Sequence, residues 1–385
     1  MKNNILILAD TNLKKDGRIR RHIFSLIEKY NITITGLSNP EIENVKFIDC
    51  SKQPITMIEL EAKKSQLRER LNQKLFEEVY WSEQYILRMY EELKNKNYNL
   101  IIANDISMVP LGVELSKKMN IPIIADMHEY APKEFEDDKN WRDMFQEYKY
   151  YLCRNYLHKC DCVFTVSKRI AKEYYDVFGI EVKVFTNAPI YSDININMKK
   201  TTNLIKLVYH GVCNKSRNLE ELINLADLLD DRYSIDFYLI GNKNDEYYKN
   251  LINKIHNSKK CSLRKPVKPE EIITMLNNYD IGLCLIPPVN FNYENCLPNK
   301  FFEYIHGRLA IATGPSIEMK NYIQKFNCGV ISDDFKAETL ANKLNKLSTT
   351  EIDKYKINSE KFAKQENYQK NKQLLLKQID KLLKI

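Results

Sequence analysis

The chain has 385 residues, of which 44% are hydrophobic and 29% charged, and its formal net charge is +8. This length suggests two domains, and the composition is typical of a globular protein rather than of a disordered or fibrous one. No apolar run is long enough to cross a membrane, and the start, MKNNILILAD, has too few consecutive apolar residues for a signal peptide. We therefore expect a cytoplasmic protein.

The positive charge is compatible with three kinds of partner, namely nucleic acid, an anionic membrane and a phosphorylated small molecule. Basic residues gather at 14–21 and 63–70, but neither group has the aromatic pattern of an RNA-binding module. We exclude nucleic acid and interpret most of these residues as solvated helix faces. The nine cysteines include no C-x-x-C pair, and no histidine pair completes a zinc site with Cys160 and Cys162. Reduced, buried thiols are the favoured interpretation.

In the first half of the chain, strand-like and helix-like segments alternate. Residues 58–94 carry apolar positions at helical spacing and predict one or two long helices. The other predicted elements, in chain order, are strand 5–9, helix 19–30, strand 32–37, strand 100–103, helix 110–119, strand 121–125, strand 162–166 and strand 182–185.

A polar stretch without periodicity, DININMKKTTN, follows Pro189 and is the best linker candidate. A second alternating series comes after it, and the last twenty residues predict one amphipathic helix. The elements predicted in this series are strand 204–209, helix 219–229, strand 235–240, helix 246–256, helix 270–277 and strand 281–286.

This alternation predicts an α/β protein made of two doubly wound domains, each with a parallel sheet covered on both faces. Ligands in such sheets bind beyond the carboxyl ends of the strands, and we expect a central cleft that the two domains face. The predicted boundaries are 1–190 for the first domain, 191–203 for the linker, 204–365 for the second domain and 366–385 for a C-terminal helix that packs back toward the first domain.

Residues 294–314, ENCLPNKFFEYIHGRLAIATG, are the most informative stretch. Pro298 and Asn299 predict a helix start, Gly307 predicts its end, and residues 309–312 predict a buried strand. Glu303 stands among apolar neighbours, where a carboxylate is costly without a partner. It is either a helix-edge carboxylate or a ligand-binding residue near a helix N-terminus that attracts phosphate.

The stretch 208–222, VYHGVCNKSRNLEEL, predicts a strand, a glycine turn and a helix. Glycine at 211 permits close approach of the backbone to a ligand, and Arg217 ahead of the helix is placed to bind a diphosphate. An ordinary solvated arginine is the open alternative. The stretch lacks the glycine pattern of a Walker loop or a dinucleotide fingerprint, which argues against an NTPase or a dehydrogenase.

The stretch 123–132, IIADMHEYAP, places Asp126, His128 and Glu129 at the end of a strand. A histidine there can orient a sugar hydroxyl, although a lone histidine is more often structural. The chain has no D-x-D pair, and transferases that hold a nucleotide through a divalent metal usually need closely spaced carboxylates. We therefore expect neither a metal requirement nor a cofactor.

Taken together, these residues resemble a retaining glycosyltransferase of family 4, with the GT-B fold of two facing Rossmann-like domains. The resemblance covers nearly the whole chain, in the family's order, through the segments 16–37, 104–132, 160–189, 210–229 and 294–314.

The resemblance implies roles for particular residues. Glu303 matches the second glutamate of the family's Glu-x7-Glu pattern, which holds the nucleotide ribose, and Arg217 matches the basic residue that neutralises the donor diphosphate. His128 matches the histidine beside the transferred sugar. Donor contacts are further expected from Gly17, Gly211 and Lys300, and acceptor-side contacts from Asp16, Asp126 and Glu129.

The sequence departs from the family pattern at three points. The first glutamate of the pattern falls on Asn295, with Glu294 one residue earlier, and which of the two contacts the donor stays open. Val212 occupies the place of the usual arginine, whose charge Lys300 can replace. Pro298 replaces the usual glycine and removes one N–H donor.

The resemblance implies transfer of a sugar from a nucleotide diphosphate sugar to a saccharide or lipid-linked acceptor, with retained configuration and with His128, Arg217 and Glu303 as catalytic residues. Bacterial surface polysaccharide or glycoconjugate assembly is the expected setting. The alternatives are a nucleotide-sugar epimerase or phosphorylase on the same fold and a non-catalytic partner subunit. Peripheral association with the inner face of the membrane through the basic helices stays open, as do the sugar, the base and the oligomeric state.

Overall fold

The computed structural model describes residues 2–51, 54, 56–198 and 204–385. The chain divides into two compact units. Unit 1 comprises residues 1–186, 290–292 and 371–385, and unit 2 comprises residues 187–289 and 293–370. Each unit has its own parallel sheet and its own hydrophobic core.

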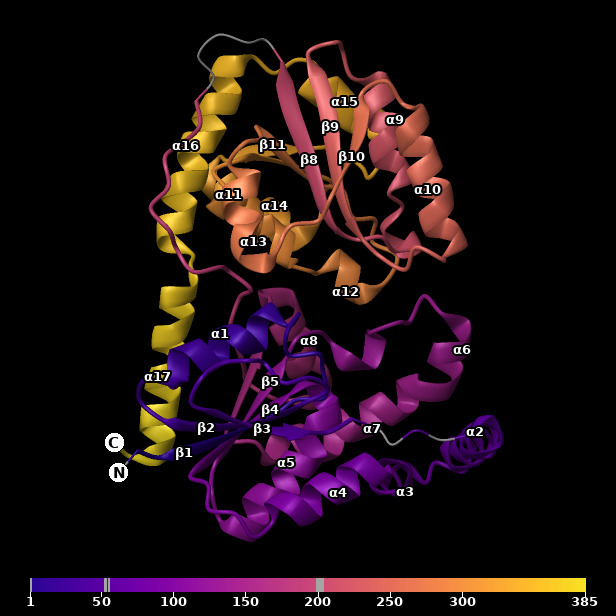
Figure 1. The fold of residues 1–385 in the computed structure, drawn as a ribbon, viewed down its shortest axis with the longest axis vertical. Coiled ribbons are helices and arrows are strands. Elements are labelled where there is room, and N and C mark those ends of the chain that lie inside the picture. Colours follow the sequence, from indigo (N-terminus) through magenta and orange to yellow (C-terminus); the bar gives the residue numbers. More distant parts are fainter. Residues whose placement is uncertain (1, 52–53, 55, 199–203) are drawn as a thin grey trace. The chain divides into compact units, whose positions relative to one another are not determined.

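In the described part of unit 1, seven parallel strands follow the order β3-β2-β1-β4-β5-β6-β7 (Figure 1). The central strands are buried on both faces, which explains their continuous apolar sequence. The strands are β1 (Asn4–Leu8), β2 (Asn31–Gly36), β3 (Val45–Asp49), β4 (Leu100–Asn104), β5 (Ile123–Met127), β6 (Cys162–Thr165) and β7 (Val182–Val184).

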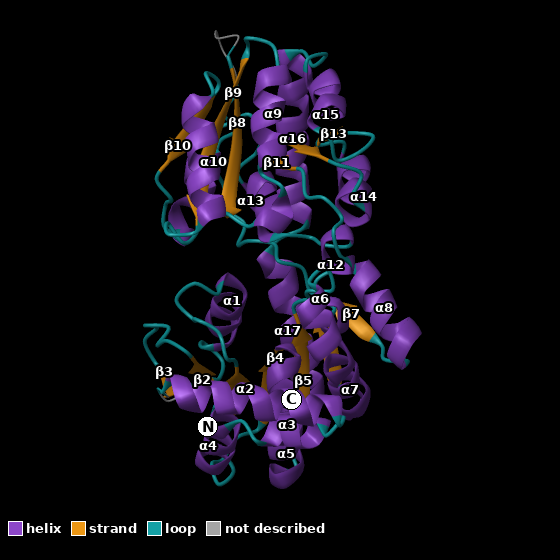
Figure 2. Ribbon diagram, turned by 90° about the vertical axis from the view of Figure 1, so that its right-hand side faces the viewer, coloured by secondary structure: helices purple, strands orange, loops and turns teal. Residues whose placement is uncertain are grey.

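Helices cover both faces of this sheet, as the two ribbon views show (Figures 1 and 2). They are α1 (Gly17–Leu26), α2 (Met57–Asn72), α3 (Phe76–Trp81), α4 (Gln84–Leu93), α5 (Asp105–Met119), α6 (Lys139–Trp141), α7 (Glu147–Tyr156) and α8 (Lys168–Phe178). Short 3-10 or π turns lie at η1 (Ala131–Lys133), η2 (Arg142–Gln146) and η3 (Leu157–Lys159).

In the described part of unit 2, six parallel strands follow the order β10-β9-β8-β11-β12-β13. Both sheets therefore have the doubly wound topology, in which the strand order reverses beside the first strand of the unit. The strands are β8 (Ile205–Val212), β9 (Tyr233–Ile240), β10 (Cys261–Arg264), β11 (Ile281–Cys284), β12 (Ala310–Thr313) and β13 (Gly329–Ile331).

The helices of unit 2 again flank the sheet on both faces (Figure 2). They are α9 (Glu220–Leu228), α10 (Glu246–Asn257), α11 (Ile272–Leu276), α13 (Asn299–His306), α14 (Ile317–Phe326), α15 (Ala337–Leu344) and α16 (Thr349–Gln365), with 3-10 turns at η4 (Lys215–Arg217) and η5 (Pro269–Glu271). The short helix α12 (Phe291–Glu294) begins in unit 1 and ends in unit 2. The last helix, α17 (Tyr368–Leu383), continues from unit 2 into unit 1.

The two predicted parallel sheets are confirmed, with corrections to individual elements. Residues 58–94 form three helices rather than one or two, because the chain breaks at Lys74, in a left-handed conformation, and again before Gln84. Helix α5 begins five residues before Pro110, which lies inside it. Asn299 does not cap α13, whose N-cap residue is Pro298, whereas Gly307 ends that helix as predicted.

The structural division lies close to the predicted domain boundaries but differs in detail. Unit 1 ends at Thr186 rather than at 190, and residues 290–292 cluster with it. Of the predicted linker, residues 191–198 have no regular structure and residues 199–203 lie outside the described residues. The C-terminal helix begins at Tyr368, and its residues from 371 onward cluster with unit 1, where Asn371 donates to the Thr186 carbonyl at 2.8 Å.

No helix among the described residues is long and apolar enough to cross a bilayer. All nine cysteines are free thiols, and six of them are buried.

Candidate functional site

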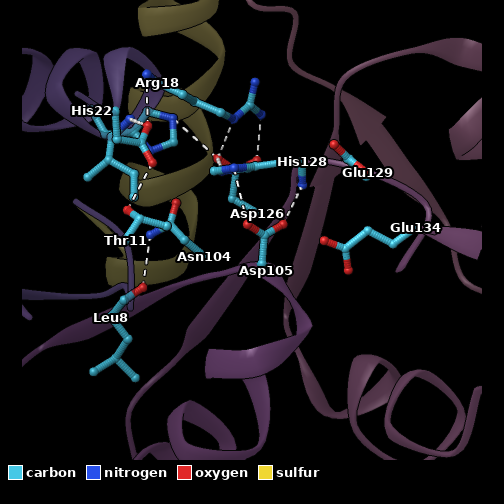
Figure 3. A network of polar contacts seen from close by, with 12 residues as sticks. Leu8, Thr11, Arg18, His22, Asn104, Asp105, Asp126, His128, Glu129 and Glu134 are labelled. Atoms are coloured by element: carbon cyan, nitrogen blue, oxygen red, sulfur yellow. Dashed lines mark hydrogen bonds and ion pairs between the residues drawn. The ribbon is translucent and has the colours of Figure 1, made fainter. Parts of the chain in front are cut away.

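Polar side chains gather at the carboxyl ends of the central strands in each unit. In unit 1 they form a cluster that we define as Arg18, His22, Asp105, Asp126 and His128, and it is drawn in Figure 3. In unit 2 they form a second cluster, defined as Tyr209, His210, Gly211, Arg217, Tyr293, Lys300 and Glu303. Both clusters lie near the point where the strand order reverses, which is where doubly wound sheets bind ligands.

The unit 1 cluster is built on a buried ion pair between α1 and β5. The Arg18 guanidinium donates to both carboxylate oxygens of Asp126, with Nε–Oδ2 at 2.8 Å and Nη2–Oδ1 at 2.5 Å. Its Nη1 donates to the carbonyl of Phe185, whose ring also lies against the guanidinium. Although burial acts in the other direction, Arg18 holds the pKa of Asp126 well below its usual range. Asp126 is thus a buried carboxylate that is fully paired.

The two histidines of this cluster are held in opposite charge states. His128 Nδ1 lies 3.2 Å from Asp105, and its Nε2 lies 3.6 Å from Asp126. Burial lowers the pKa of His128, but these two carboxylates outweigh burial and raise it to about 9. His22 lies 3.5 Å from Asp126, yet its complete burial lowers its pKa to about 4. At neutral pH, His128 is therefore charged and His22 neutral.

The other predicted residues of unit 1 have local roles. Asp16 caps α1, since its Oδ1 accepts from the N–H groups of Arg18 and Ile19, and Thr11 donates to its Oδ2. Gly17 is the first residue of that helix. The Glu129 side chain is exposed, and its backbone carbonyl accepts from the Tyr174 hydroxyl at 2.8 Å.

In unit 2, two cationic side chains converge on the end of β8. Gly211 has a φ of +133°, a region that favours glycine. A Cβ atom placed there would lie 3.2 Å from Lys300 Nζ and 3.6 Å from Arg217 Nη1. The backbone of Gly211 therefore lies beside both an ammonium and a guanidinium, which come from α13 and η4.

Lys300 is the most unusual group of this cluster. Its side chain is 4% exposed, its Nζ has no hydrogen-bond partner among the described residues, and it lies 3.7 Å from the centroid of the Tyr209 ring. Burial, together with the nearby Arg217, lowers the pKa of Lys300 well below its usual range. A buried cation without an anion is costly, so this geometry suits an anionic ligand that completes the site.

Arg217 and Glu303 are held by neighbours in the same unit. Although burial acts in the other direction, the hydroxyls of Tyr209 and Tyr293 raise the pKa of the Arg217 guanidinium. Glu303 Oε2 lies 3.3 Å from Nε2 of His210. Burial lowers the pKa of His210 to about 3, with Lys300 and Arg217 acting in the same direction, so this histidine is neutral. The cluster therefore combines two cations, one carboxylate and a neutral imidazole.

The structure also shows where the residues that depart from the family pattern lie. Glu294 is exposed at the end of α12, whereas Asn295 is buried in the turn that follows. Val212, the last residue of β8, is 50% exposed. Pro298 has extended backbone angles immediately ahead of α13. Gly211, Arg217, Lys300 and Glu303 are thus brought together, with Val212 at the edge of the cluster.

Several residues of the clusters were missed by sequence reasoning. Arg18 belongs to a basic group that we interpreted as mostly solvated, yet its side chain is 5% exposed. Asp105 directly follows a buried strand. A carboxylate at the end of a buried strand was the signal that pointed to Asp126, but we did not apply it to Asp105. His22, His210, Tyr209 and Tyr293 carry no local signal, because their contacts depend on tertiary packing.

The left-handed backbone at Gly211 gives a direct test of the unit 2 cluster. We expect Gly211→Ala to lower the affinity for any anion bound between Lys300 and Arg217 by about tenfold, since alanine strains the backbone and displaces the ammonium. Calorimetric titration with a nucleoside diphosphate measures the change. Gly179→Ala is the matched control, because Gly179 also has a positive φ, 70°, but lies at the end of α8 with open space around it. Equal effects of both substitutions on affinity would contradict a local role.

Among the described residues, no group of three histidine, cysteine, aspartate or glutamate side chains is arranged to hold a metal ion.

Comparison with known proteins gives one family match and several similar folds. Residues 59–188, which lie in unit 1 up to Thr186, match the family model Glycosyltransferase Family 4. A search of curated proteins gave no match. The fold is similar to that of HepE from Anabaena in complex with UDP and glucose, with a TM-score of 0.72 and 12% identity over 99% of this chain and 100% of that chain. The chain thus has the GT-B fold, and part of it matches a glycosyltransferase family.

Two further solved structures show how widely this fold matches. HepE in complex with UDP-glucose aligns with a TM-score of 0.71 and 12% identity, over 98% of this chain and 100% of HepE. Sucrose-phosphate synthase from Thermosynechococcus elongatus aligns with a TM-score of 0.73 and 11% identity, over 99% of both chains. At these identities, the likeness establishes only the fold of this chain.

Proposed function

We propose that this glycosyltransferase moves a sugar from a nucleotide diphosphate sugar to an acceptor hydroxyl with retention of configuration. The observation that carries the proposal is the pair of cations at Gly211, where Lys300 has a buried ammonium without a hydrogen-bond partner among the described residues. A diphosphate is the anion that this pair suits, because two adjacent phosphates can contact both cations at once. The family match and the complexes of HepE with UDP and UDP-glucose support the same donor class.

The chemistry assigned to unit 2 is electrostatic. As the bond between the sugar and the diphosphate breaks, its electron pair passes to the leaving phosphate oxygen, where negative charge develops. Lys300 and Arg217 stabilise that charge, and preorganised charges of this kind usually make the largest single contribution to catalysis. The Glu303 carboxylate accepts hydrogen bonds from the ribose hydroxyls. Lys300 takes over the charge that the residue at Val212 usually supplies in the family.

Retention follows from the face of the sugar that the acceptor attacks in this proposal. The acceptor hydroxyl attacks the anomeric carbon from the face that the diphosphate leaves, and the leaving phosphate oxygen takes the hydroxyl proton. This step needs neither an enzyme nucleophile nor a metal ion, and we propose that the reaction proceeds without a cofactor. His128 in unit 1 acts beside the transferred sugar, with Gly17 in contact with the donor and with Asp16 and Glu129 on the acceptor side.

The proposed setting is the assembly of a surface polysaccharide or glycoconjugate in the cytoplasm. A lipid-linked acceptor would bring the enzyme to the inner face of the membrane. Co-sedimentation with anionic vesicles tests that association, and its absence at low salt would exclude it.

The deciding experiment titrates the protein with a panel of nucleoside diphosphates and their glucose conjugates, beginning with UDP and UDP-glucose. We expect binding in the micromolar range, and we expect Arg217→Ala and Glu303→Ala each to lower the rate of transfer at least tenfold. Lys249→Ala, an exposed change on α10, is the control and should leave both unchanged.

The outcomes separate the alternatives. Lack of binding to every nucleoside diphosphate would favour a non-catalytic partner subunit. Conversion of the donor to an epimer without any acceptor would favour an epimerase. Near wild-type transfer by both the Arg217 and Glu303 variants would overturn the assignment of the unit 2 cluster.

A further inference from the structure

Asp105 has a strained backbone conformation at the carboxyl end of β4. Its φ is 58°, in the left-handed region, although it is the first residue of α5 and not a glycine. Aspartate and asparagine tolerate this region better than other residues, but it still costs energy there. Strain of this kind persists only where the surroundings fix it, and it is concentrated at functional sites. The contacts of the Asp105 side chain are therefore informative.

The carboxylate of Asp105 contacts His128 at two points. Oδ1 accepts the backbone N–H of His128 at 3.0 Å, and Oδ2 lies 3.2 Å from the ring nitrogen Nδ1. The other ring nitrogen, Nε2, lies 3.6 Å from Asp126 (Figure 3). A neutral imidazole carries a proton on only one of its nitrogens, whereas an imidazolium carries one on each. A ring with a carboxylate beside both nitrogens therefore suits the charged form.

The charges around this ring come from four elements. Asp105 begins α5 and Asp126 lies on β5, while Arg18 and His22 project from α1. Burial raises the pKa of Asp105, and the negative charges of Asp126 and of Asp10, which follows β1, act in the same direction, whereas His128 acts against them. Arg18 is paired with Asp126, and burial keeps His22 neutral, as its pKa of about 4 indicates. Arg18 thus neutralises Asp126, whereas among the described residues His128 is the cation beside Asp105. The negative charge of Asp105 therefore acts on His128.

We propose that Asp105 is a positioning residue, which fixes the ring and backbone of His128 and keeps the imidazole in its charged form. In the reaction proposed above, on which the catalytic part of this inference rests, an imidazolium beside the transferred sugar is a fixed positive charge and not a general base. The raised pKa of His128, about 9, agrees with this arrangement.

Asp105→Asn removes the negative charge of the side chain and keeps its geometry. Asparagine tolerates the same backbone conformation and keeps an oxygen that accepts the His128 N–H, so the fold should persist. We expect the titration midpoint of His128, followed by NMR of histidine-labelled protein and assigned with His128→Gln, to fall from about 9 by at least one pH unit. Asp143→Asn, an exposed change on η2 in the same unit, is the matched control and should leave the midpoint unchanged.

The NMR measurement needs no substrate, so it is independent of the proposed function. A wild-type midpoint at 7 or below would overturn the inference even if the variant failed to fold, and so would a midpoint in Asp105→Asn equal to that of the wild type.

In the transfer assay, kcat of Asp105→Asn should begin to fall at lower pH than kcat of the wild type, while KM for the donor changes less than twofold. A pH profile of kcat identical to the wild type would exclude the catalytic part of the inference. A shifted midpoint in a protein that transfers no sugar would uphold the positioning of His128 and overturn only the proposed function.

Discussion

Replacing Lys300 by methionine should weaken the binding of a nucleoside diphosphate at least 100-fold while making the unliganded protein more stable. The two effects have one cause, which is the burial of an ammonium without a hydrogen-bond partner among the described residues. In the free protein that charge is destabilising, and an apolar side chain of similar length should raise the free energy of unfolding by about 1 kcal/mol. In the complex it contacts the diphosphate, and loss of such a contact typically costs about 3 kcal/mol, or about 100-fold in affinity.

Two measurements check this prediction, namely the affinity for UDP by calorimetry and the midpoint of thermal unfolding without ligand. Lys320→Met, an exposed change on α14, is the matched control and should alter neither quantity appreciably. A purely structural lysine would give the opposite pattern, with lower stability and unchanged affinity. That pattern would remove Lys300 from the donor site.

The fold could be predicted because its main signals are local in the sequence. Each central strand is a short, continuously apolar run, and a strand of this kind is buried on both faces of a parallel sheet whatever its neighbours are. The edge strands β3 and β10 are partly exposed and have no such run, so they were missed. The start of helix α5 was placed too late because Pro110 suggested a first turn. Pro110 is instead the sixth residue of this helix, where proline removes one intrahelical hydrogen bond.

The two clusters differ in how far the sequence could predict them. Gly211 lies near the end of a strand, and Arg217 and Lys300 lie near helix starts. Glu303 stands among apolar neighbours. These local patterns marked the four residues as candidates, and the family resemblance assigned their roles. Arg18 is different, because its partner Asp126 is 108 residues away and its burial depends on the packing of α1 against the sheet. Charged residues are mostly exposed, and no local pattern distinguishes a buried arginine from a solvated one.

The Arg18–Asp126 pair should be the largest single polar contribution to the stability of unit 1. We expect Arg18→Met to lower the free energy of unfolding by about 3–5 kcal/mol at pH 7, because it leaves the buried carboxylate of Asp126 unpaired. Asp126 has a lowered pKa in the folded protein, so its contribution to stability is present above the unfolded value of about 4 and is lost as the pH falls below it. The difference between wild type and variant should therefore shrink in acid.

Denaturant unfolding at pH 7 and at about pH 3 measures both parts of this prediction. Arg154→Met, an exposed change on α7, controls for the loss of one positive charge. The double variant Arg18→Met/Asp126→Leu removes both charges, and it should recover much of the stability, since an apolar pair of similar volume often replaces a buried ion pair without net loss. A double variant no more stable than Arg18→Met would show that shape rather than charge holds α1 against β5. Recovery of stability without recovery of transfer would instead indicate that the pair is needed to orient His128, which lies 3.6 Å from the same Asp126 carboxylate oxygen.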